Sequence, residues 1–538
     1  MHKTSTHDNL VLQQLRENRA IFEERLAAWR RHPTLENTQT LVDFFVFQRM
    51  CGVWYCPEIH EYLIDYAKEH SGHCVGEASD TSKTGTLHVL TEGYASGGHT
   101  RVLERWVEQD PDGGPHTVIV YDQKDTKAID RLKQKVLDQG GEFIVIPRET
   151  PMMDKVETLR HQACAGYQHI VLHTHMNDMV PVMAFGVPAF RKNGTPVIAF
   201  NHGGHRASLL GPEYVSATME IEAGQQAITH HLRKVPSVLS AIPADDLTKT
   251  PPSCEEKREL RKTLGLPEDS TLLLSMARSY KFAPIQGYAF SPAGEQAPLS
   301  QEPLVFTKAM QDVLQQNPSA HLVLIGVAPE SSIWRSLNKN LRNRVHFLKE
   351  MPYPKITEYL RAADVYLDPF YNSWTSMVDA LSEGLPVLSL RTPVGLPIFF
   401  DDNTGVALSV SDWHDKANEL IENPDKRSPL HLRQFENMKR SQPDASFYER
   451  IRACAKTGEG DTDIAECPQD SEGFCRLDYH NAALEMSGGK TKFYGIPCVI
   501  GVERTKTSYG ERNARIVFPF LEATWPCLRQ HFFAERSG

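Results

Sequence analysis

Short apolar runs alternate with amphipathic helical patterns through most of the sequence, and this alternation restricts the fold more than any other feature. One series of apolar runs includes HTVIVYD, EFIVIPR, HIVLHTH and TPVIAFNH. A second series includes TLLLSMARSYKFAP, AHLVLIGV, RVHFLKEM, DVYLDPF and LPVLSLR. Strands that alternate with helices of this length form parallel sheets covered by helices on both faces. The sequence therefore predicts an α/β chain with two tandem Rossmann-like, doubly wound domains.

Four segments follow from these patterns. Residues 1–84 carry apolar residues at helical spacing, and we expect a helical N-terminal segment there. The two Rossmann-like domains are expected at residues 85–245 and 246–456. The second of them opens with a stretch rich in proline and charge, IPADDLTKTPPSCEEKRELRKTLGLPEDS, which reads as a linker. Periodicity fades in residues 457–538, which stay an unassigned C-terminal tail.

Charge and composition exclude several classes of protein. The net charge is −10, from 68 acidic and 58 basic residues, and no long basic stripe is present, so we expect no nucleic-acid partner. The first residues lack an apolar signal region, and no stretch of about 20 apolar residues follows, so we expect a cytoplasmic protein without a transmembrane segment. The ten cysteines include no CxxC pair, which argues against a disulfide framework and a zinc site.

Polar residues after the run VYLDPF indicate an anion site. A turn leads into a predicted helix with Trp374, Thr375 and Ser376 at its first positions. Hydroxyls and free backbone N–H groups at a helix N-terminus bind phosphate well. Asp379 lies one turn further on the same face, where its carboxylate could accept hydrogen bonds from a ribose diol. The same residues also fit a capped core helix without a ligand.

Three motifs together resemble those of GT-B glycosyltransferases, in particular the inverting protein O-GlcNAc transferase group and its bacterial relatives. The segment NSWTSMVDALSEGLPVL is similar to their nucleotide-diphosphate and ribose motif, N-G-x-T-T-x-x-D-x-L-x-x-G-x-P-V-V. The segment SYKFAP is similar to their x-Y-K-x-x-P motif, whose lysine meets the β-phosphate. This resemblance implies that Lys281 and Tyr280 lie at the donor, with Arg278 adding positive charge to the diphosphate site.

The third motif lies in the first domain. The segment GYASGGH is similar to the family's G-Y-x-S loop, which is followed by a histidine at the start of a helix. The resemblance implies that Gly97 and Gly98 let the backbone approach the nucleotide sugar. It also implies that His99 faces the cleft between the domains, where an imidazole can serve as a general base or proton relay.

A further loop, FNHGGH, resembles the N-H-x-x-H loop on the acceptor side of some GT-B transferases. Through this resemblance we expect Asn201, His202 and His205 to contact the acceptor. GT-B enzymes generally need no metal, because lysine, helix N-termini and hydroxyls neutralise the departing diphosphate. We therefore expect no metal and no cofactor, with the nucleotide sugar as donor substrate.

The resemblance covers roughly residues 86–455, and two departures stand out. Trp374 replaces a small residue or histidine of the family motif. Tyr371 and Asp379 stand where retaining GT-B enzymes often have glutamates, which favours inversion. The resemblance implies a metal-independent, hexosyltransferase-type enzyme that moves a sugar from a nucleotide sugar, a UDP-sugar foremost, to a hydroxyl or amide of a protein or glycan.

Two alternatives stay open, because fold does not determine function. One is a nucleotide-sugar epimerase or hydrolase on the same scaffold. The other is a non-catalytic module that binds a nucleotide sugar or a glycan.

Overall fold

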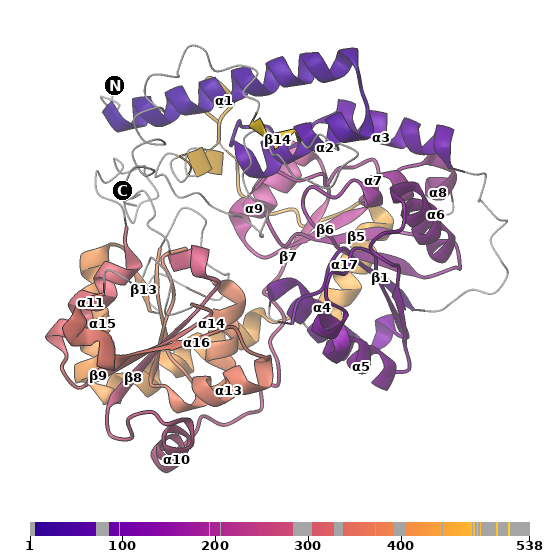
Figure 1. Cartoon of the computed structure of the whole chain (residues 1–538). Helices are drawn as coiled ribbons and strands as arrows, with labels where there is room; N and C mark the ends of the chain where they lie inside the picture. The colour runs from indigo at the N-terminus through magenta and orange to yellow at the C-terminus, as the bar shows by residue number, and fades with distance from the viewer. Residues whose placement is uncertain are drawn as a thin grey trace. The chain divides into compact units, whose positions relative to one another are not determined.

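The structure of the 538-residue chain is a computed structural model (Figure 1). It divides into two units, residues 1–489 and 490–538, which are described separately. The described residues are 6–71, 85–95, 97–192, 194–204, 206–282, 304–327, 337–371, 373–391, 400, 405–443, 445–467, 469–475, 477–478, 481–482, 485, 502–503 and 515–516.

The first sheet has seven strands in the order β3-β2-β1-β4-β5-β6-β7, and all its neighbouring strands are parallel. Its strands are β1 (Thr86–Leu90), β2 (His116–Val120), β3 (Glu142–Val145), β4 (His169–His173), β5 (Val197–Phe200), β6 (Ala217–Glu220) and β7 (Ser237–Leu239). The strand order reverses between β1 and β4. In open parallel sheets ligands bind beyond the carboxyl ends of the strands at such a point.

Helices follow the strands of this sheet as the alternation predicts. They are α4 (Gly98–Gln109), α5 (Asp130–Asp138), α6 (Met152–Ala163), α7 (Val180–Phe185), α8 (Pro188–Lys192) and α9 (Ala223–Ile228). The helix α4 directly follows the loop after β1, so its N-terminus lies at the carboxyl edge of the sheet. This placement brings the GYASGGH loop to the edge where a ligand would bind.

The second sheet has six parallel strands in the order β10-β9-β8-β11-β12-β13. Its strands are β8 (Thr271–Met276), β9 (Ala320–Ile325), β10 (Val345–Leu348), β11 (Val365–Leu367), β12 (Val387–Leu390) and β13 (Val406–Ala407). Its helices are α11 (Phe306–Gln316), α13 (Tyr353–Ala362), α14 (Trp374–Ser382), α15 (Val410–Glu422) and α16 (Arg427–Ser441). The predicted fold class, with two Rossmann-like doubly wound sheets in tandem, is confirmed.

The stretch read as a linker contains a helix, α10 (Cys254–Leu264), so that part of the prediction is wrong. The Ser253 side chain accepts from the backbone N–H of Glu256, and the Glu256 side chain accepts from the backbone N–H of Ser253, which forms a capping box. Gly265 ends the helix with a φ of 67°, a left-handed conformation that suits glycine. The S-x-x-E pattern was the signal for this helix, although proline and charge dominate the surrounding sequence.

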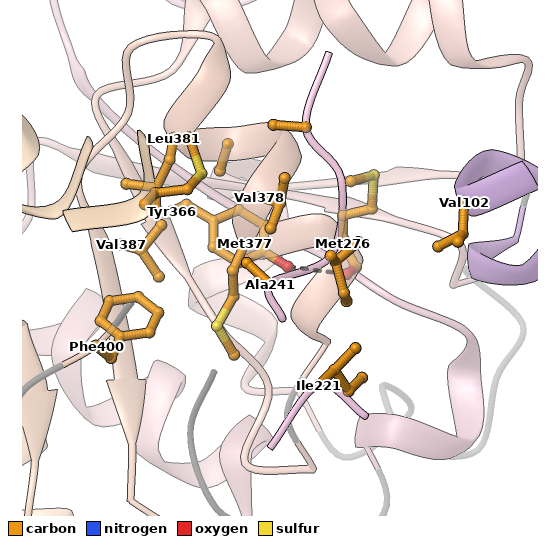
Figure 2. Packing of buried hydrophobic residues seen from close by; sticks show 14 of the residues in the cluster. Val102, Ile221, Ala241, Met276, Tyr366, Met377, Val378, Leu381, Val387 and Phe400 are labelled. Carbon is orange, nitrogen blue, oxygen red and sulfur yellow. Dashed lines mark hydrogen bonds between the residues drawn. The ribbon is translucent and has the colours of Figure 1, made fainter. Parts of the chain in front are cut away.

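Apolar side chains from elements of both sheets meet in one buried cluster (Figure 2). It includes Val102 of α4, and Tyr366 and Val378 from β11 and α14. The Tyr366 hydroxyl donates to the Met276 carbonyl at 3.0 Å, so its one polar group is satisfied inside the cluster. Burial of this size is the main favourable contribution to folding.

A late helix, α17 (Ala445–Thr457), packs against β5, β6 and β7 of the first sheet. The ring centroids of Tyr448 on α17 and Trp106 on α4 are 5.3 Å apart, and both side chains are buried. Arg452 of α17 donates to the Asp110 carboxylate at 2.8 Å. The chain therefore returns to the first sheet after completing the second.

The N-terminal segment is helical, as predicted: α1 (Thr6–Arg31), α2 (Leu35–Asp43), a π-helical turn at Phe44–Gln48 and α3 (Pro57–His70). Part of the unassigned tail packs on it, because Phe474 and Leu477 share a buried cluster with Val11 and Leu15 of α1. In the second unit, β14 (Val502–Glu503) and β15 (Arg515–Ile516) pair antiparallel. The segment boundaries at 84, 245 and 456 stay a prediction.

No helix among the residues that the structure describes is long and apolar enough to cross a membrane.

The second sheet supplies a test of core packing. Leu324 on β9 has no exposed surface, whereas Leu432 on α16 is 54% exposed. We expect Leu324→Ala to lower the free energy of unfolding by ~2–5 kcal/mol, through lost burial and the cavity left behind. The matched control, Leu432→Ala, should stay within ~0.5 kcal/mol of the parent. Urea denaturation measures both, and equal effects of the two substitutions would contradict the burial described for β9.

Candidate active site

The glycine loop before α4 lies against residues of the second sheet's domain. A Cβ on Gly98 would lie 3.0 Å from the Thr375 hydroxyl, and one on Gly97 would lie 3.4 Å from the Arg278 guanidinium. The Arg278 guanidinium carbon is also 5.0 Å from the centroid of the Tyr94 ring. The structure thus brings together residues of the GYASGGH and NSWTSMVDALSEGLPVL motifs with Arg278, which directly precedes the SYKFAP motif. A Cβ at Gly98 would be in tight contact with Thr375, so the glycine gives room for this approach.

Lys281 lies in a short 3-10 turn, Ser279–Phe282, directly after β8. Burial lowers the pKa of Lys281 to about 8, and the positive charge of Arg278 adds to this effect, while Asp368 opposes it. Burial likewise raises the pKa of Asp368 to about 8. Asp368 accepts hydrogen bonds from the Ser373 backbone N–H at 3.0 Å and from the Ser389 hydroxyl at 3.3 Å. Burial disfavours the charged form of Lys281, and a phosphate beside the lysine would stabilise that form.

The start of α14 carries the predicted anion-binding residues. Thr375 faces Gly98, as the short Cβ distance shows. The Ser376 side chain hydrogen-bonds Tyr366 within the second sheet's domain. The indole N–H of Trp374 is buried, and it has no hydrogen-bond partner among the described residues. A buried donor without a partner is costly, so Trp374 is a group that a ligand oxygen would stabilise.

Asp379 is held in a buried ion cluster that sequence analysis missed. Its carboxylate is bound by the fully buried guanidinium of Arg105, and the Tyr353 hydroxyl donates to Oδ1 at 3.2 Å. Arg105 also donates to Asp245 Oδ1 at 3.0 Å and to the Pro243 carbonyl at 2.8 Å. Asp379 is only 4% exposed. Its predicted contact with a ribose therefore requires Oδ2, because Oδ1 already accepts two hydrogen bonds.

Three histidines lie together at the carboxyl edge of the first sheet. The rings of His99 and His202 stack with centroids 4.0 Å apart and an interplanar angle of 24°, and the His175 ring lies 6.0 Å from that of His99. Burial, and then the neighbouring imidazoles, hold the pKa values of His99 and His202 well below the usual range. Both rings are therefore neutral near pH 7, and each neutral imidazole has one donor and one acceptor nitrogen.

Asn201 holds a buried glutamate at the same edge. Its side-chain amide donates to both carboxylate oxygens of Glu220, at 3.0 and 2.9 Å, and the Thr229 hydroxyl donates to one of them at 2.7 Å. Burial raises the pKa of Glu220 to about 7, although the Arg233 charge and these hydrogen bonds oppose the shift. Both oxygens belong to one carboxylate and face the same N–H of Asn201, so its second N–H and its amide oxygen are the groups that it can offer to an acceptor substrate.

A small cavity of about 10 Å³ opens beside these residues, at the ends of β4 and β5. Its polar lining includes His175, Asn201, His202 and Tyr214. The cavity has room for about one water molecule. His205 and the Tyr280 side chain lie outside the described residues, so the structure does not place them.

Within the described part of the chain, no group of three or more histidine, cysteine, aspartate or glutamate side chains is arranged to hold a metal ion.

Parts of the chain are similar to known glycosyltransferases. Residues 295–423 match the family model described as glycosyl transferases group 1. A D-inositol 3-phosphate glycosyltransferase of Corynebacterium diphtheriae is 25% identical over 195 residues, which are 34% of this chain and 41% of that relative. A GDP-mannose-dependent monoacylated alpha-(1-6)-phosphatidylinositol monomannoside mannosyltransferase of Corynebacterium glutamicum is 21% identical over 332 residues, which are 57% of this chain and 80% of the relative.

Two solved structures are similar to the chain. An O-GlcNAc transferase variant of Thermobaculum terrenum has 14% identity, a TM-score of 0.45 and 84% coverage of each chain. The Anabaena protein HepE, in complex with UDP and glucose, has 14% identity and a TM-score of 0.49, with 69% of this chain and 99% of that chain covered.

The family-model match and the curated relatives support a relationship to the group 1 glycosyltransferases. The more specific kinship with the inverting O-GlcNAc transferase group stays a prediction.

The buried Glu220 generates a prediction on pH dependence. The pKa of this carboxyl is about 7 in the folded chain, against ~4.3 for an unperturbed glutamate. Between these pH values the folded state binds more protons than the unfolded state. The stabilisation of the folded state by Glu220 is therefore fully present below pH ~4, and it is lost as the pH rises through about 7. Glu220→Gln cannot titrate. We expect the stability of the parent relative to this variant to fall between about pH 5 and pH 8.

Urea denaturation across this pH range measures the difference. The exposed Glu422 on α15 provides the control, because Glu422→Gln removes one charge from the surface rather than from the interior. A constant difference between the parent and Glu220→Gln at all pH values would contradict the raised pKa.

Proposed function

We propose that the chain is a GT-B glycosyltransferase that moves a sugar from a nucleotide sugar to a hydroxyl or amide acceptor. The observation that carries the proposal is the meeting of the Gly97-Gly98 loop with Thr375 and Arg278. The glycines and Thr375 come from two separate motifs, Arg278 directly precedes a third, and the family-model match at residues 295–423 covers the motif that contains Thr375. The matches to curated relatives add support, since one relative is named as a glycosyltransferase and the other as a mannosyltransferase.

In this proposal the donor diphosphate lies between Lys281, Arg278 and the first turn of α14. The backbone N–H groups of Trp374, Thr375 and Ser376 and the two cationic side chains stabilise the charge that grows on the leaving diphosphate. Tyr280 lies beside the lysine in the same motif. Burial lowers the pKa of Lys281, and a phosphate beside the lysine would stabilise its charged form and offset the cost of burying the ammonium group.

The acceptor then lies at the carboxyl edge of the first sheet. His99 orients or deprotonates the attacking group, because burial keeps its imidazole neutral, and a neutral imidazole has an acceptor nitrogen. Asn201, His202 and His205 contact the acceptor on the same side. Asp379 reaches the ribose through Oδ2. No metal or cofactor takes part in this scheme, because cationic side chains and N–H groups supply the positive charge.

Three finer features complete the proposal. The donor is a UDP-sugar, with a GDP-sugar as the second candidate, because one curated relative is named as GDP-mannose-dependent. The acceptor belongs to a protein or a glycan. The reaction inverts the anomeric centre, since Tyr371 and Asp379 occupy positions that are often glutamates in retaining enzymes. The product's anomeric configuration, read by proton NMR, decides this last feature.

A nucleotide panel tests the donor site. We expect one of UDP, GDP, ADP and TDP to raise the unfolding temperature selectively, since a ligand at 100 times its Kd adds ~2.7 kcal/mol of stability. Binding without turnover of the matching nucleotide sugar would instead indicate a non-catalytic module, and turnover of the donor without an acceptor would indicate an epimerase or hydrolase. No shift with any nucleotide would contradict the proposed donor site.

Lys281→Ala tests the role of the cation at the diphosphate. Loss of a charge-assisted hydrogen bond should weaken nucleotide binding by ~1.5–3 kcal/mol, which is roughly 10- to 150-fold in Kd. The control is Lys308→Ala, which removes an exposed lysine from α11 of the same domain. Isothermal titration calorimetry with the preferred nucleotide measures both variants. Equal affinities in the two variants would remove Lys281 from the donor site.

A further inference from the structure

Histidines from β2, β1 and β4 and from the loop after β5 form a row on one face of the first sheet. His116 begins β2, His88 lies in β1, His173 ends β4, and His202 follows β5 by two residues. The register pairs His116 with Thr86, and His173 with Leu90, so each lies two positions from the level of His88. Side chains two positions apart in a strand point to the same face. The histidines therefore form a diagonal row that rises toward the carboxyl edge of the sheet.

The four imidazoles are joined by hydrogen bonds. His202 Nε2 lies 3.2 Å from His173 Nδ1. His173 Nε2 lies 3.3 Å from His88 Nδ1, and His88 Nε2 lies 3.0 Å from His116 Nδ1. The row ends where His116 Nε2 meets the backbone carbonyl oxygen of Asp110 at 3.0 Å. Every link joins the Nε2 atom of one residue to an acceptor position on the next.

The carbonyl at the end of the row determines the direction of all these hydrogen bonds. A carbonyl oxygen can only accept, so His116 carries its proton on Nε2 and leaves Nδ1 as an acceptor. His88 must then donate from Nε2 to that acceptor, and the same rule applies to His173. Finally His202 donates from Nε2 to His173. A neutral imidazole has only one N–H, so Nδ1 of His202 is left as an acceptor.

Burial keeps the imidazoles of the row neutral, as this argument requires. His88 and His173 have no exposed surface, and His116 is 3% exposed. Burial lowers the pKa of each of these three histidines, that of His173 to about 3. The Trp106 ring packs edge-on against His88 and His173, with centroids 6.0 and 5.9 Å away. His88 and His173 therefore offer no exposed surface to which water could hydrogen-bond.

The charged groups beside the row do not change the direction of its hydrogen bonds. The Asp110 carboxylate is next to His116, but Arg452 donates to both of its oxygens at 2.8 Å. The Trp106 indole N–H also donates to this carboxylate, at 3.3 Å. Because the carboxylate is paired in this way, its attraction for a second proton on His116 is offset.

We propose that His116, His88 and His173 are positioning residues that set the tautomer of His202, so that its Nδ1 receives a hydrogen bond from the acceptor substrate. This inference rests on the proposed function for the identity of the acceptor. The group recognised at His202 is then a hydrogen-bond donor, a hydroxyl or an amide N–H, and not a carboxylate or phosphate oxygen. Cooperative polarisation along the row strengthens the acceptor character of Nδ1.

The tautomer of His202 can be measured without any substrate. The full chain is labelled with 15N-histidine, and long-range proton–nitrogen NMR distinguishes a protonated from a bare nitrogen in each ring. The His202 signals are identified by their loss in His202→Asn. We expect His202 to be neutral near pH 7, with its proton on Nε2. A proton on Nδ1, or a charged ring, would overturn the proposal.

Two substitutions at the far end of the row test its direction. His116→Leu removes the acceptor for His88, so we expect His202 to populate both tautomers. His116→Asn keeps an acceptor oxygen for His88, because its amide N–H₂ group can face the Asp110 carbonyl, and we expect it to retain the Nε2 proton on His202. The parent spectrum decides the tautomer even if His116→Leu fails to fold. If His116→Leu folds and leaves the His202 tautomer unchanged, the row does not set it.

An activity readout separates this proposal from the proposed function. With acceptor substrate varied, His116→Leu should lower kcat/KM about 2- to 10-fold, the loss of roughly one hydrogen bond, while His116→Asn restores it. The nucleotide affinity of both variants should equal that of the parent. Failure of every nucleotide to bind would overturn the proposed function but leave the NMR result intact. An altered nucleotide affinity in His116→Leu would show that the row affects donor binding, which would contradict its proposed role in acceptor recognition alone.

Discussion

The guanidinium of Arg105 has no exposed surface, and the arrangement of the candidate site depends on the partners that satisfy it. Those partners are the carboxylates of Asp245 and Asp379 and the carbonyl of Pro243. A buried charge that loses its partner is destabilising by several kcal/mol. The cluster therefore joins α4, which begins with the glycine loop and His99, to α14, which begins with Thr375. The close approach of Gly98 to Thr375 follows from this junction.

Burial also determines the chemistry available at the site. The same low-polarity surroundings that require partners for Arg105 lower the pKa of Lys281 and of the histidines, and raise the pKa of Glu220. In these surroundings an incoming anion interacts strongly with the Lys281 ammonium, and an incoming hydroxyl interacts strongly with the neutral imidazoles. The reason is that electrostatic interactions are poorly screened there. The site thus combines the buried ion pairs of Arg105 with the neutral imidazoles of His99 and His202 at the edge of the first sheet.

Local patterns in the sequence indicated much of the fold and part of the site. The alternation of apolar runs predicted both parallel sheets, and the structure brings the predicted residues Gly97 and Gly98 close to Arg278 and Thr375, while their roles stay a prediction. The helix α10 was missed, although Ser253 and Glu256 spell a capping box, because proline and charge around it suggested a linker. The histidine row was missed too. Histidines inside the apolar runs HTVIV, TLHVL and HIVLH were its signal, but their order across the sheet depends on the strand order.

The sequence by itself determined the elements and their type, because the period of the apolar residues distinguishes strands from helices. It also placed the glycines of the GYASGGH loop and the hydroxyls of Thr375 and Ser376 after predicted strands. The tertiary structure alone decided which distant groups meet. Arg105 and Asp379 are 274 residues apart, and no local pattern specifies their pairing. The direction of hydrogen bonding from Asp110 to His202 likewise arises only when four strands lie side by side, since each imidazole takes its tautomer from its neighbour.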